Sequence, residues 1–136
     1  MVFLDANVLV YYLDETADLH KDTIARLQVL VDDQARLVTS HHVLEEVLFV
    51  FRKFYKSQDL NKAALKIGDL PTLTLIEPAA SIAFASRYAS LASGQGMGVN
   101  DALLLQLMLD GGVKQLFTYD EKFIKQASKL GIEAVS

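Results

Sequence analysis

Four acidic residues, spread along the whole chain, are of the type that supports metal-assisted chemistry. They are Asp5, Glu46, Asp101 and Asp120. Carboxylates held within a few ångströms raise one another's pKa, so a cluster of them calls for a cation. The chain has no cysteine, so a metal must bind oxygen or imidazole, and oxygen ligands favour Mg²⁺ or Mn²⁺. The matching reaction is phosphodiester hydrolysis, with one metal activating a water and another stabilising the leaving oxygen.

The elements that would position these acids follow an alternating pattern. Short β-rich runs occur at residues 2–4, 37–39, 73–76, 116–118 and 132–135. Helical spacing or composition predicts helices near residues 24–31, 43–54, 61–69, 79–91, 101–109 and 123–130. Strands that alternate with helices predict an α/β fold with three layers. A central, mainly parallel sheet of about four or five strands would carry helices on both faces.

Such a sheet gathers functional residues at one edge, because ligands bind beyond the carboxyl ends of parallel strands. Asp5 and Asp120 each follow a predicted strand, and Glu46 lies early in the helix after the strand at 37–39. Asp101 opens a nearly all-apolar helix that follows a glycine-rich segment. The four acids can therefore converge on one pocket.

Helix capping is the alternative interpretation of each aspartate. Asp5 can be the N-cap of a following helix. Asn100 can cap the next helix, which leaves Asp101 as a first-turn acid favoured by the helix dipole. Thr118 and the glutamate three residues later match a capping box, with Asp120 in the first turn.

Two adjacent glutamates compete for the position on the second helix. Val43 and Val50 lie three residues before and four residues after Glu46, which places Glu46 at the border of an apolar stripe. Glu45 lies closer to the polar side. The periodicity favours Glu46, although it separates the two only weakly.

Four motifs in chain order carry a resemblance to a known family. Residues 3–9 contain Asp-x-Asn, residues 40–47 place a Glu six positions after a Ser, residues 98–104 contain Asp-Ala at the head of a helix, and residues 116–123 contain Thr-x-Asp followed by Phe. Each motif alone is weak, but the four together, at suitable spacing, are strong. The whole chain thus resembles the PIN-domain family, in particular the VapC-type toxins of bacterial and archaeal toxin–antitoxin modules.

The resemblance implies a site and a function. One or two Mg²⁺ or Mn²⁺ ions would be ligated by Asp5, Glu46, Asp101 and Asp120. Asn7 and Thr118 would support the site by hydrogen bonds. The implied activity is that of an endoribonuclease, the toxin of a type II module, commonly a homodimer and inhibited by a cognate VapB-like antitoxin.

Charge and hydropathy limit the partners. A net charge of -4 argues against binding nucleic acid mainly through a basic surface, since such affinity comes from many contacts between cations and phosphates. Arg52, Lys53 and Lys56 would place RNA phosphates near the pocket; a solvated helix end is the alternative. No apolar run approaches the roughly 20 residues that span a bilayer, and the start of the chain lacks a basic signal region. We expect one cytoplasmic domain over residues 1–136, without a membrane.

Other functions compete with this hypothesis. A phosphatase with Asp5 as nucleophile would look for Asp-x-Asp, and here the third position is Asn7. A receiver-type signalling domain has no evident place for Glu46 and Asp101. A PIN nuclease that processes RNA outside a toxin–antitoxin module, or a PIN scaffold that only binds RNA or protein, remains an alternative.

Overall fold

Five short strands form the central sheet of the computed structural model, which describes residues 1–55 and 59–135. The strands are β1 Val2–Leu4, β2 Leu37–Thr39, β3 Thr74–Leu75, β4 Gln115–Phe117 and β5 Glu133–Ala134. Their order is β3-β2-β1-β4-β5, and every neighbouring pair is parallel. The predicted α/β fold with a parallel sheet is therefore confirmed, and β1 is its central strand.

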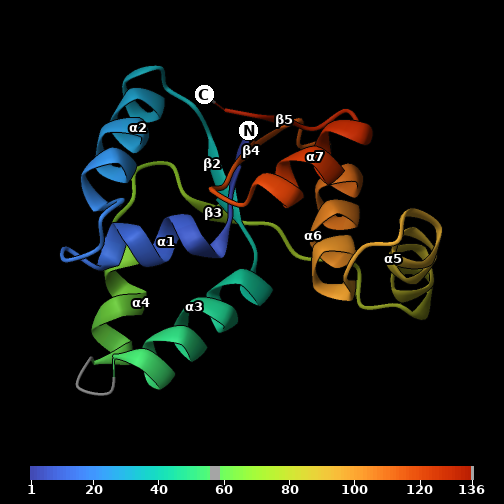
Figure 1. Cartoon of the computed structure of the whole chain (residues 1–136), viewed down its shortest axis with the longest axis horizontal. Helices are drawn as coiled ribbons and strands as arrows, with labels where there is room; N and C mark the ends of the chain where they lie inside the picture. Colours follow the sequence, from blue (N-terminus) through green and yellow to red (C-terminus); the bar gives the residue numbers. More distant parts are fainter. Residues whose placement is uncertain (56–58, 136) are drawn as a thin grey trace.

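Helices connect the strands and cover the sheet. Those in the described residues are α1 Ala6–Leu13, α2 His20–Asp32, α3 His41–Phe54, α4 Leu60–Gly68, α5 Ile82–Gln95, α6 Val99–Asp110 and α7 Glu121–Lys129. In Figure 1, α1 to α4 lie on one side of the strands and α5 to α7 on the other. The sheet is thus the middle layer of three.

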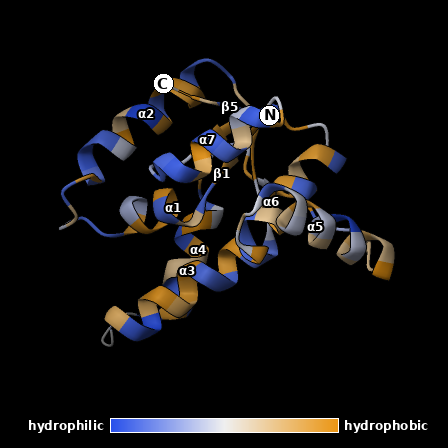
Figure 2. Cartoon of the chain, turned by 45° about the vertical axis from the view of Figure 1, so that its right-hand side comes forward, coloured by the Kyte–Doolittle hydropathy of each residue, from blue (hydrophilic) through white to orange (hydrophobic). Residues whose placement is uncertain are grey.

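The core forms where the two helical layers meet the sheet. All of β1 is buried, and the inner positions of α6 are buried as well. Burial on both faces of the sheet explains why β1 is a continuous apolar run rather than an alternating one. Figure 2 shows α3 banded by hydrophobic and hydrophilic residues, as expected for a helix with one face on the core. β1 and the first turns of α3 and α6 are therefore firmly placed.

The start of α5 differs from the sequence prediction. The spacing predicts a helix from residue 79, whereas the helix begins after Ser81, whose hydroxyl accepts a hydrogen bond from the Phe84 backbone N–H at 3.2 Å. The helix ends at Gly96, whose φ of 62° lies in the left-handed region that glycine tolerates. Only Phe84 of α5 is buried, and the helix extends outward beyond α6 (Figure 1).

The sequence predicts that no segment is long and apolar enough to span a membrane. Across residues 1–55 and 59–135, no helix combines enough length and apolar character to cross a bilayer.

Candidate active site

Asp5 lies at the carboxyl end of the central strand, and the residue is only 9% exposed. Its Oδ1 accepts a hydrogen bond from the Ala6 backbone N–H at 2.8 Å, so Asp5 is the N-cap of α1. Its Oδ2 accepts a second bond from the Thr118 hydroxyl at 2.7 Å. Capping and membership of the acidic cluster are therefore compatible, because the two carboxylate oxygens face different partners.

Asn7 and Thr118 join the loop after β1 to the loop after β4. The Asn7 amide nitrogen donates to the Thr118 hydroxyl oxygen at 3.0 Å and, more weakly, to Asp5 Oδ2 at 3.4 Å. The Asn7 amide oxygen accepts from the Tyr119 backbone N–H at 3.1 Å, and the Thr118 hydroxyl accepts from the Asp120 backbone N–H at 3.1 Å. These bonds fix the orientation of Asp5 and the start of the segment that carries Asp120.

The start of α7 corrects one capping prediction. The N-cap of α7 is Asp120, whose Oδ1 accepts from the Phe123 backbone N–H at 3.1 Å. The capping box with Thr118 as N-cap is therefore wrong, and the Thr118 hydroxyl instead donates to Asp5 and accepts from the Asp120 backbone N–H.

The start of α6 corrects a second capping prediction. Gly98 is its N-cap without a side-chain bond, so Asn100 does not cap this helix, while Asp101 does lie in its first turn. The Asn100 amide oxygen lies 3.3 Å from Nε2 of His42, which connects the first turns of α3 and α6. The two helices that carry Glu46 and Asp101 are thereby linked.

Burial and neighbouring charge raise the pKa of Asp5. Burial is the largest cause, and the charges of Asp101 and Asp120 act in the same direction. The hydrogen bonds from Thr118 and Ala6 act in the opposite direction without cancelling the shift. Asp5 is thus a carboxylate whose charge is costly unless a cation lies beside it.

Glu46 and Asp101 show the same pattern. Burial is the first cause of the raised pKa of Glu46, followed by the charge of Asp5, while His42 lowers it and Asp101 raises it further. Burial again raises the pKa of Asp101, together with the charge of Asp120 and against the charge of Lys122. Each of the four acids is therefore close enough to at least one other for their charges to interact.

Glu46, rather than Glu45, takes part in these interactions. Glu45 lies beside His41, with 3.8 Å between Oε1 and Nε2, and its side chain is 67% exposed. The two adjacent residues project about 100° apart on α3, so only one of them is directed to the site.

The donor set fits a hard divalent cation. It consists of carboxylate oxygens, which Mg²⁺ and Mn²⁺ prefer, and burial together with neighbouring acids raises the pKa of Asp5, Glu46 and Asp101. Within the described part of the chain, no three carboxylate or imidazole side chains form a ready-made coordination group. The fit therefore depends on donor chemistry and shared electrostatics.

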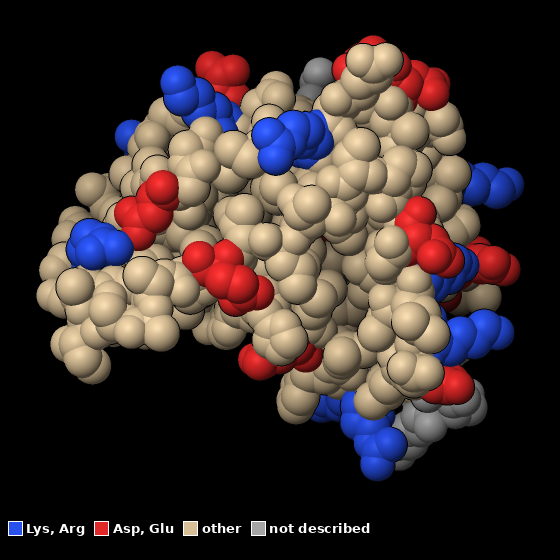
Figure 3. Space-filling model, turned by 180° about the vertical axis from the view of Figure 1, so that it is seen from behind, with Lys and Arg blue, Asp and Glu red and all other residues tan. Residues whose placement is uncertain are grey.

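The predicted RNA-binding residues lie apart from the acids. Arg52 and Lys53 occupy the exposed last turn of α3, about 9 Å along the helix axis from Glu46. The Lys53 ammonium lies 5.3 Å from the ring centre of Phe54. Lys56 lies outside the described residues. On the face shown in Figure 3, basic and acidic side chains are interspersed with broad areas that carry neither.

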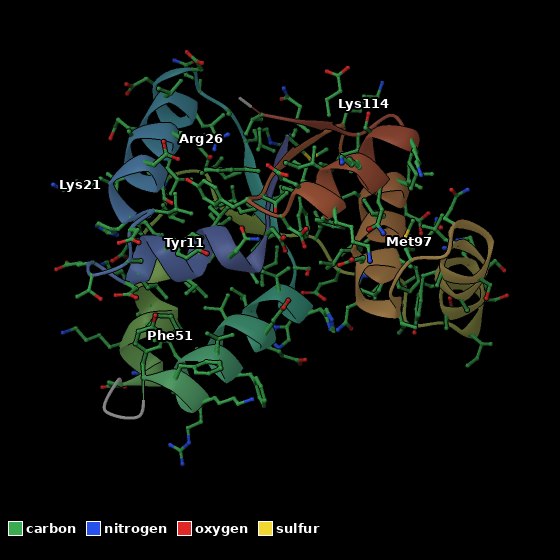
Figure 4. The ribbon with its side chains drawn as sticks, viewed as in Figure 1. Tyr11, Lys21, Arg26, Phe51, Met97 and Lys114 are labelled. Carbon is green, nitrogen blue, oxygen red and sulfur yellow. The ribbon has the colours of Figure 1, made fainter. Side chains whose placement is uncertain are left out.

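Sequence reasoning missed a set of residues on α2 that contacts the turn after β4. Tyr119 donates its hydroxyl to Oδ2 of Asp22 at 2.6 Å and lies 2.9 Å from the Thr23 hydroxyl. Arg26 reaches from α2 toward the sheet (Figure 4) and stacks on the ring of Phe117. The sequence carries one signal for this contact: Thr23 lies four residues before Leu27, on the apolar stripe of α2. In the structure Thr23 is fully buried.

The fold and the acidic edge of the sheet define a class of protein. The family model for the PIN domain matches residues 2–129, and the chain belongs to the PIN domain family. It is similar to Ribonuclease VapC23 of Mycobacterium tuberculosis, with 28% identity over 120 residues that cover 88% of this chain and 93% of the relative.

Solved structures share the fold. VapBC2 from Rickettsia felis, in a crystal structure with a DNA fragment from its promoter, matches with a TM-score of 0.69 and 20% identity over 99% of this chain and 98% of the other. VapC20 from Mycobacterium tuberculosis, described as a toxin that cleaves the sarcin–ricin loop, matches with a TM-score of 0.68 and 15% identity over 97% and 96% of the two chains. At these identities the likeness establishes the three-layer fold.

Proposed function

We propose that this chain is a Mg²⁺- or Mn²⁺-dependent endoribonuclease of the cytoplasm and the toxin of a type II toxin–antitoxin module. One observation carries the proposal: Asp5 lies at the carboxyl end of the central strand, where burial raises its pKa and the charges of Asp101 and Asp120 add to the rise. Such a cluster is costly to fold unless it binds a cation. Membership of the PIN domain family and the ribonuclease VapC23 as a relative support the same activity.

The residues divide the work by their position. Asp5, Glu46, Asp101 and Asp120 would hold one or two ions, which when bound supply an activated water and stabilise the leaving oxygen of the phosphodiester. Thr118 and Asn7 keep Asp5 in one orientation through their hydrogen bonds to its Oδ2. Arg52, Lys53 and Lys56 would bind RNA phosphates beyond the acids.

The contacts of Asn7 disfavour a phosphatase with Asp5 as nucleophile. That chemistry uses an acid at the third position of Asp-x-Asp. Here the Asn7 amide instead joins Thr118 to the backbone of Tyr119, using both its donor and its acceptor side. Asn7 therefore holds the site together by hydrogen bonds and supplies no second carboxylate.

The partners proposed are RNA as substrate, a cognate VapB-like antitoxin and a second copy of the chain. The solved complex VapBC2 from Rickettsia felis supports the toxin–antitoxin assignment. An RNA-processing nuclease without an antitoxin and a PIN scaffold without catalysis remain alternative outcomes of the tests below.

The first test measures metal-dependent cleavage. We expect purified protein to cut single-stranded RNA with added Mg²⁺ or Mn²⁺, and EDTA to abolish cleavage. Glu46→Gln should lower the rate at least about tenfold, because it removes a ligand charge. The matched control Glu45→Gln should cleave like the wild type. Cleavage by metal-free protein, or equal rates for the two variants, would contradict the proposal.

The second test separates a toxin from an RNA-processing enzyme. Induced expression in a bacterial host should arrest growth, and Asp5→Asn should relieve the arrest. Co-expression of the product of the neighbouring reading frame should restore growth and co-purify with the chain. Intact RNA cleavage without growth arrest would assign an RNA-processing role, and binding without cleavage would assign a scaffold. Light scattering on the purified chain tests the homodimer.

A further inference from the structure

Tyr119 lies between two residues of the candidate site, Thr118 and Asp120. Its backbone N–H donates to the Asn7 amide oxygen at 3.1 Å, and the Asn7 amide nitrogen in turn donates to Asp5. Its side chain packs in another direction, edge-on against Tyr11 with 5.5 Å between ring centres and tilted against Phe117 at the same spacing. One residue thus joins the site to its scaffold.

The hydroxyl of Tyr119 is hydrogen-bonded to helix α2. It donates to Oδ2 of Asp22 at 2.6 Å and lies 2.9 Å from the hydroxyl of Thr23. Thr23 is completely buried, and its own hydroxyl lies 2.7 Å from the Leu19 carbonyl oxygen, to which it donates. A charge-assisted bond to Asp22 is among the stronger kinds of hydrogen bond, so this contact opposes movement of the ring.

Arg26, one turn further along α2, covers the same two rings. The central carbon of its guanidinium lies 4.5 Å from the ring centre of Phe117 and 5.4 Å from that of Tyr119. Its Nη2 donates to the Val135 carbonyl oxygen at 2.7 Å, and its Nη1 lies 3.7 Å from Oδ2 of Asp22. Aromatic faces attract such a cation. Both residues that flank Thr118 are therefore held from α2.

We propose that Tyr119 is a positioning residue of the site: anchored by its hydroxyl to Asp22 of α2, it holds the 118–120 turn so that Thr118 and Asp120 meet Asp5. The inference rests on the proposed metal-dependent function. Constellations that bind a metal must be held within about half an ångström, and neighbours of the ligands do this holding. Without the hydroxyl, the turn keeps its bonds to Asn7 and Asp5 but loses its outer anchor.

The test compares Tyr119→Phe with a matched control. Tyr55 also donates its hydroxyl to an aspartate, Asp14 at 2.5 Å, but at the end of α1 remote from Asp5. Tyr55→Phe therefore removes the same chemical group outside the site. Asp22→Asn is a second test variant on the surface of α2, which leaves the ring in place if Tyr119→Phe folds poorly.

Two measurements are made on the full chain. The first is Mn²⁺ affinity by calorimetry, which we expect Tyr119→Phe to weaken about three- to tenfold and Asp22→Asn to weaken less, with Tyr55→Phe unchanged. The second is amide hydrogen exchange, which should accelerate at Tyr119 and Asp120 in Tyr119→Phe, since their N–H groups bond to Asn7 and Thr118. The KM for RNA should stay near the wild-type value, while the Mn²⁺ concentration for half-maximal cleavage rises.

The outcomes separate the two proposals. Wild-type protein that neither binds Mn²⁺ nor cleaves RNA rejects the nuclease and, with it, the positioning role. Wild-type protein that does both, with Tyr119→Phe equal to Tyr55→Phe in Mn²⁺ affinity and in exchange at Asp120, rejects the positioning role alone. Equal losses of thermal stability in the two variants, without a change in Mn²⁺ affinity, likewise reduce Tyr119 to a packing residue.

Discussion

Helix α1 begins and ends at an aspartate, and the two carboxylates behave in opposite ways. Asp5 precedes the helix and accepts from Thr118 and Ala6, whereas Asp14 follows it and accepts from Tyr55 and Thr16. Each therefore has a hydroxyl donor within 2.7 Å. Hydrogen bonding alone does not distinguish the two ends.

Burial and neighbouring charge distinguish them. Burial raises the pKa of Asp5 more than its hydrogen bonds lower it, and nearby acids add to the rise. The hydrogen bonds from Tyr55 and Thr16 lower the pKa of Asp14, against only a small opposing effect of burial. The folded protein thus favours the anion of Asp14 and disfavours the anion of Asp5.

The presence of a cavity does not identify which end of α1 carries the candidate site either. A cavity of about 320 Å³ lies beside Asp14, lined also by Tyr55 and Lys62. Two of its charged groups, Lys66 and Glu15, form an ion pair at 3.9 Å, and Asp14 accepts from Tyr55. Unrelieved negative charge is therefore a better guide to the candidate site than the volume of a cavity.

Neutralising Asp5 and Asp14 in turn is the strongest test of the difference between the two ends of α1. We expect Asp5→Asn to lower RNA cleavage more than about 100-fold, because it removes a metal ligand. Asp14→Asn should leave cleavage near the wild-type rate. Both rates are measured on labelled single-stranded RNA with saturating Mn²⁺. Equal losses in the two variants would mean that the end of α1 at Asp14 belongs to the site.

Metal-linked stability is the second test. Mn²⁺ at a hundredfold excess over its dissociation constant should stabilise the wild type by about 2.7 kcal/mol, since it binds the folded state alone. For a chain of this size that corresponds to a rise in Tm of roughly 10 °C. Asp14→Asn should show the same rise, and Asp5→Asn much less. A rise of equal size in all three proteins would place the metal away from Asp5.

The pH dependence of stability should also differ in sign between the two ends. Asp5 has a folded pKa above its ordinary value of 3.8, so its favourable contribution is present below 3.8 and is lost as pH rises through the raised pKa. Asp14 has a folded pKa below 3.8, so its contribution is present above 3.8 and is lost as pH falls through the lowered pKa.

Thermal unfolding in EDTA, from about pH 3 to about pH 7, measures both contributions. Asp5→Asn should lessen the destabilisation on the way to neutral pH, while Asp14→Asn should lower the Tm near pH 7. Glu46 and Asp101, whose pKa values are also raised, leave part of the trend in Asp5→Asn. An Asp5→Asn protein less stable than the wild type at pH 7 without metal would contradict the costly-charge interpretation.

Much of this arrangement is predictable from the sequence, because it depends on local patterns. Apolar runs such as residues 2–4 identify the strands, and their alternation with helices predicts the parallel sheet. Since parallel strands end at one edge, Asp5 and Asp120 are expected there, and the structure places both there.

The remaining details depend on contacts between distant segments. The capping box predicted for α7 is wrong because Asp120 caps this helix, while the hydroxyl of Thr118 donates to Asp5, 113 residues away. The anchorage of Tyr119 on Asp22 spans 97 residues and leaves no periodic signal. Side-chain hydrogen bonds between elements follow from tertiary packing, which a pattern of residue types does not specify.

The smallest predicted effect is on RNA binding, and it tests whether RNA extends from the Asp5 end of α1 toward the Asp14 end. Arg52 and Lys53 occupy the last turn of α3, next to Tyr55, which bonds to Asp14. If RNA runs along α3, Arg52→Ala and Lys53→Ala should each weaken binding about two- to fivefold. Each should also reduce the slope of log affinity against log salt by about 0.7, the value for one phosphate contact on a single strand.

Binding is best measured in the Asp5→Asn background, where RNA stays intact. Lys129→Ala is the matched control, since Lys129 is an exposed cation in the last turn of α7. An unchanged salt slope in Arg52→Ala and Lys53→Ala would confine RNA to the Asp5 end. The two ends of α1 would then differ in substrate contact as well as in charge.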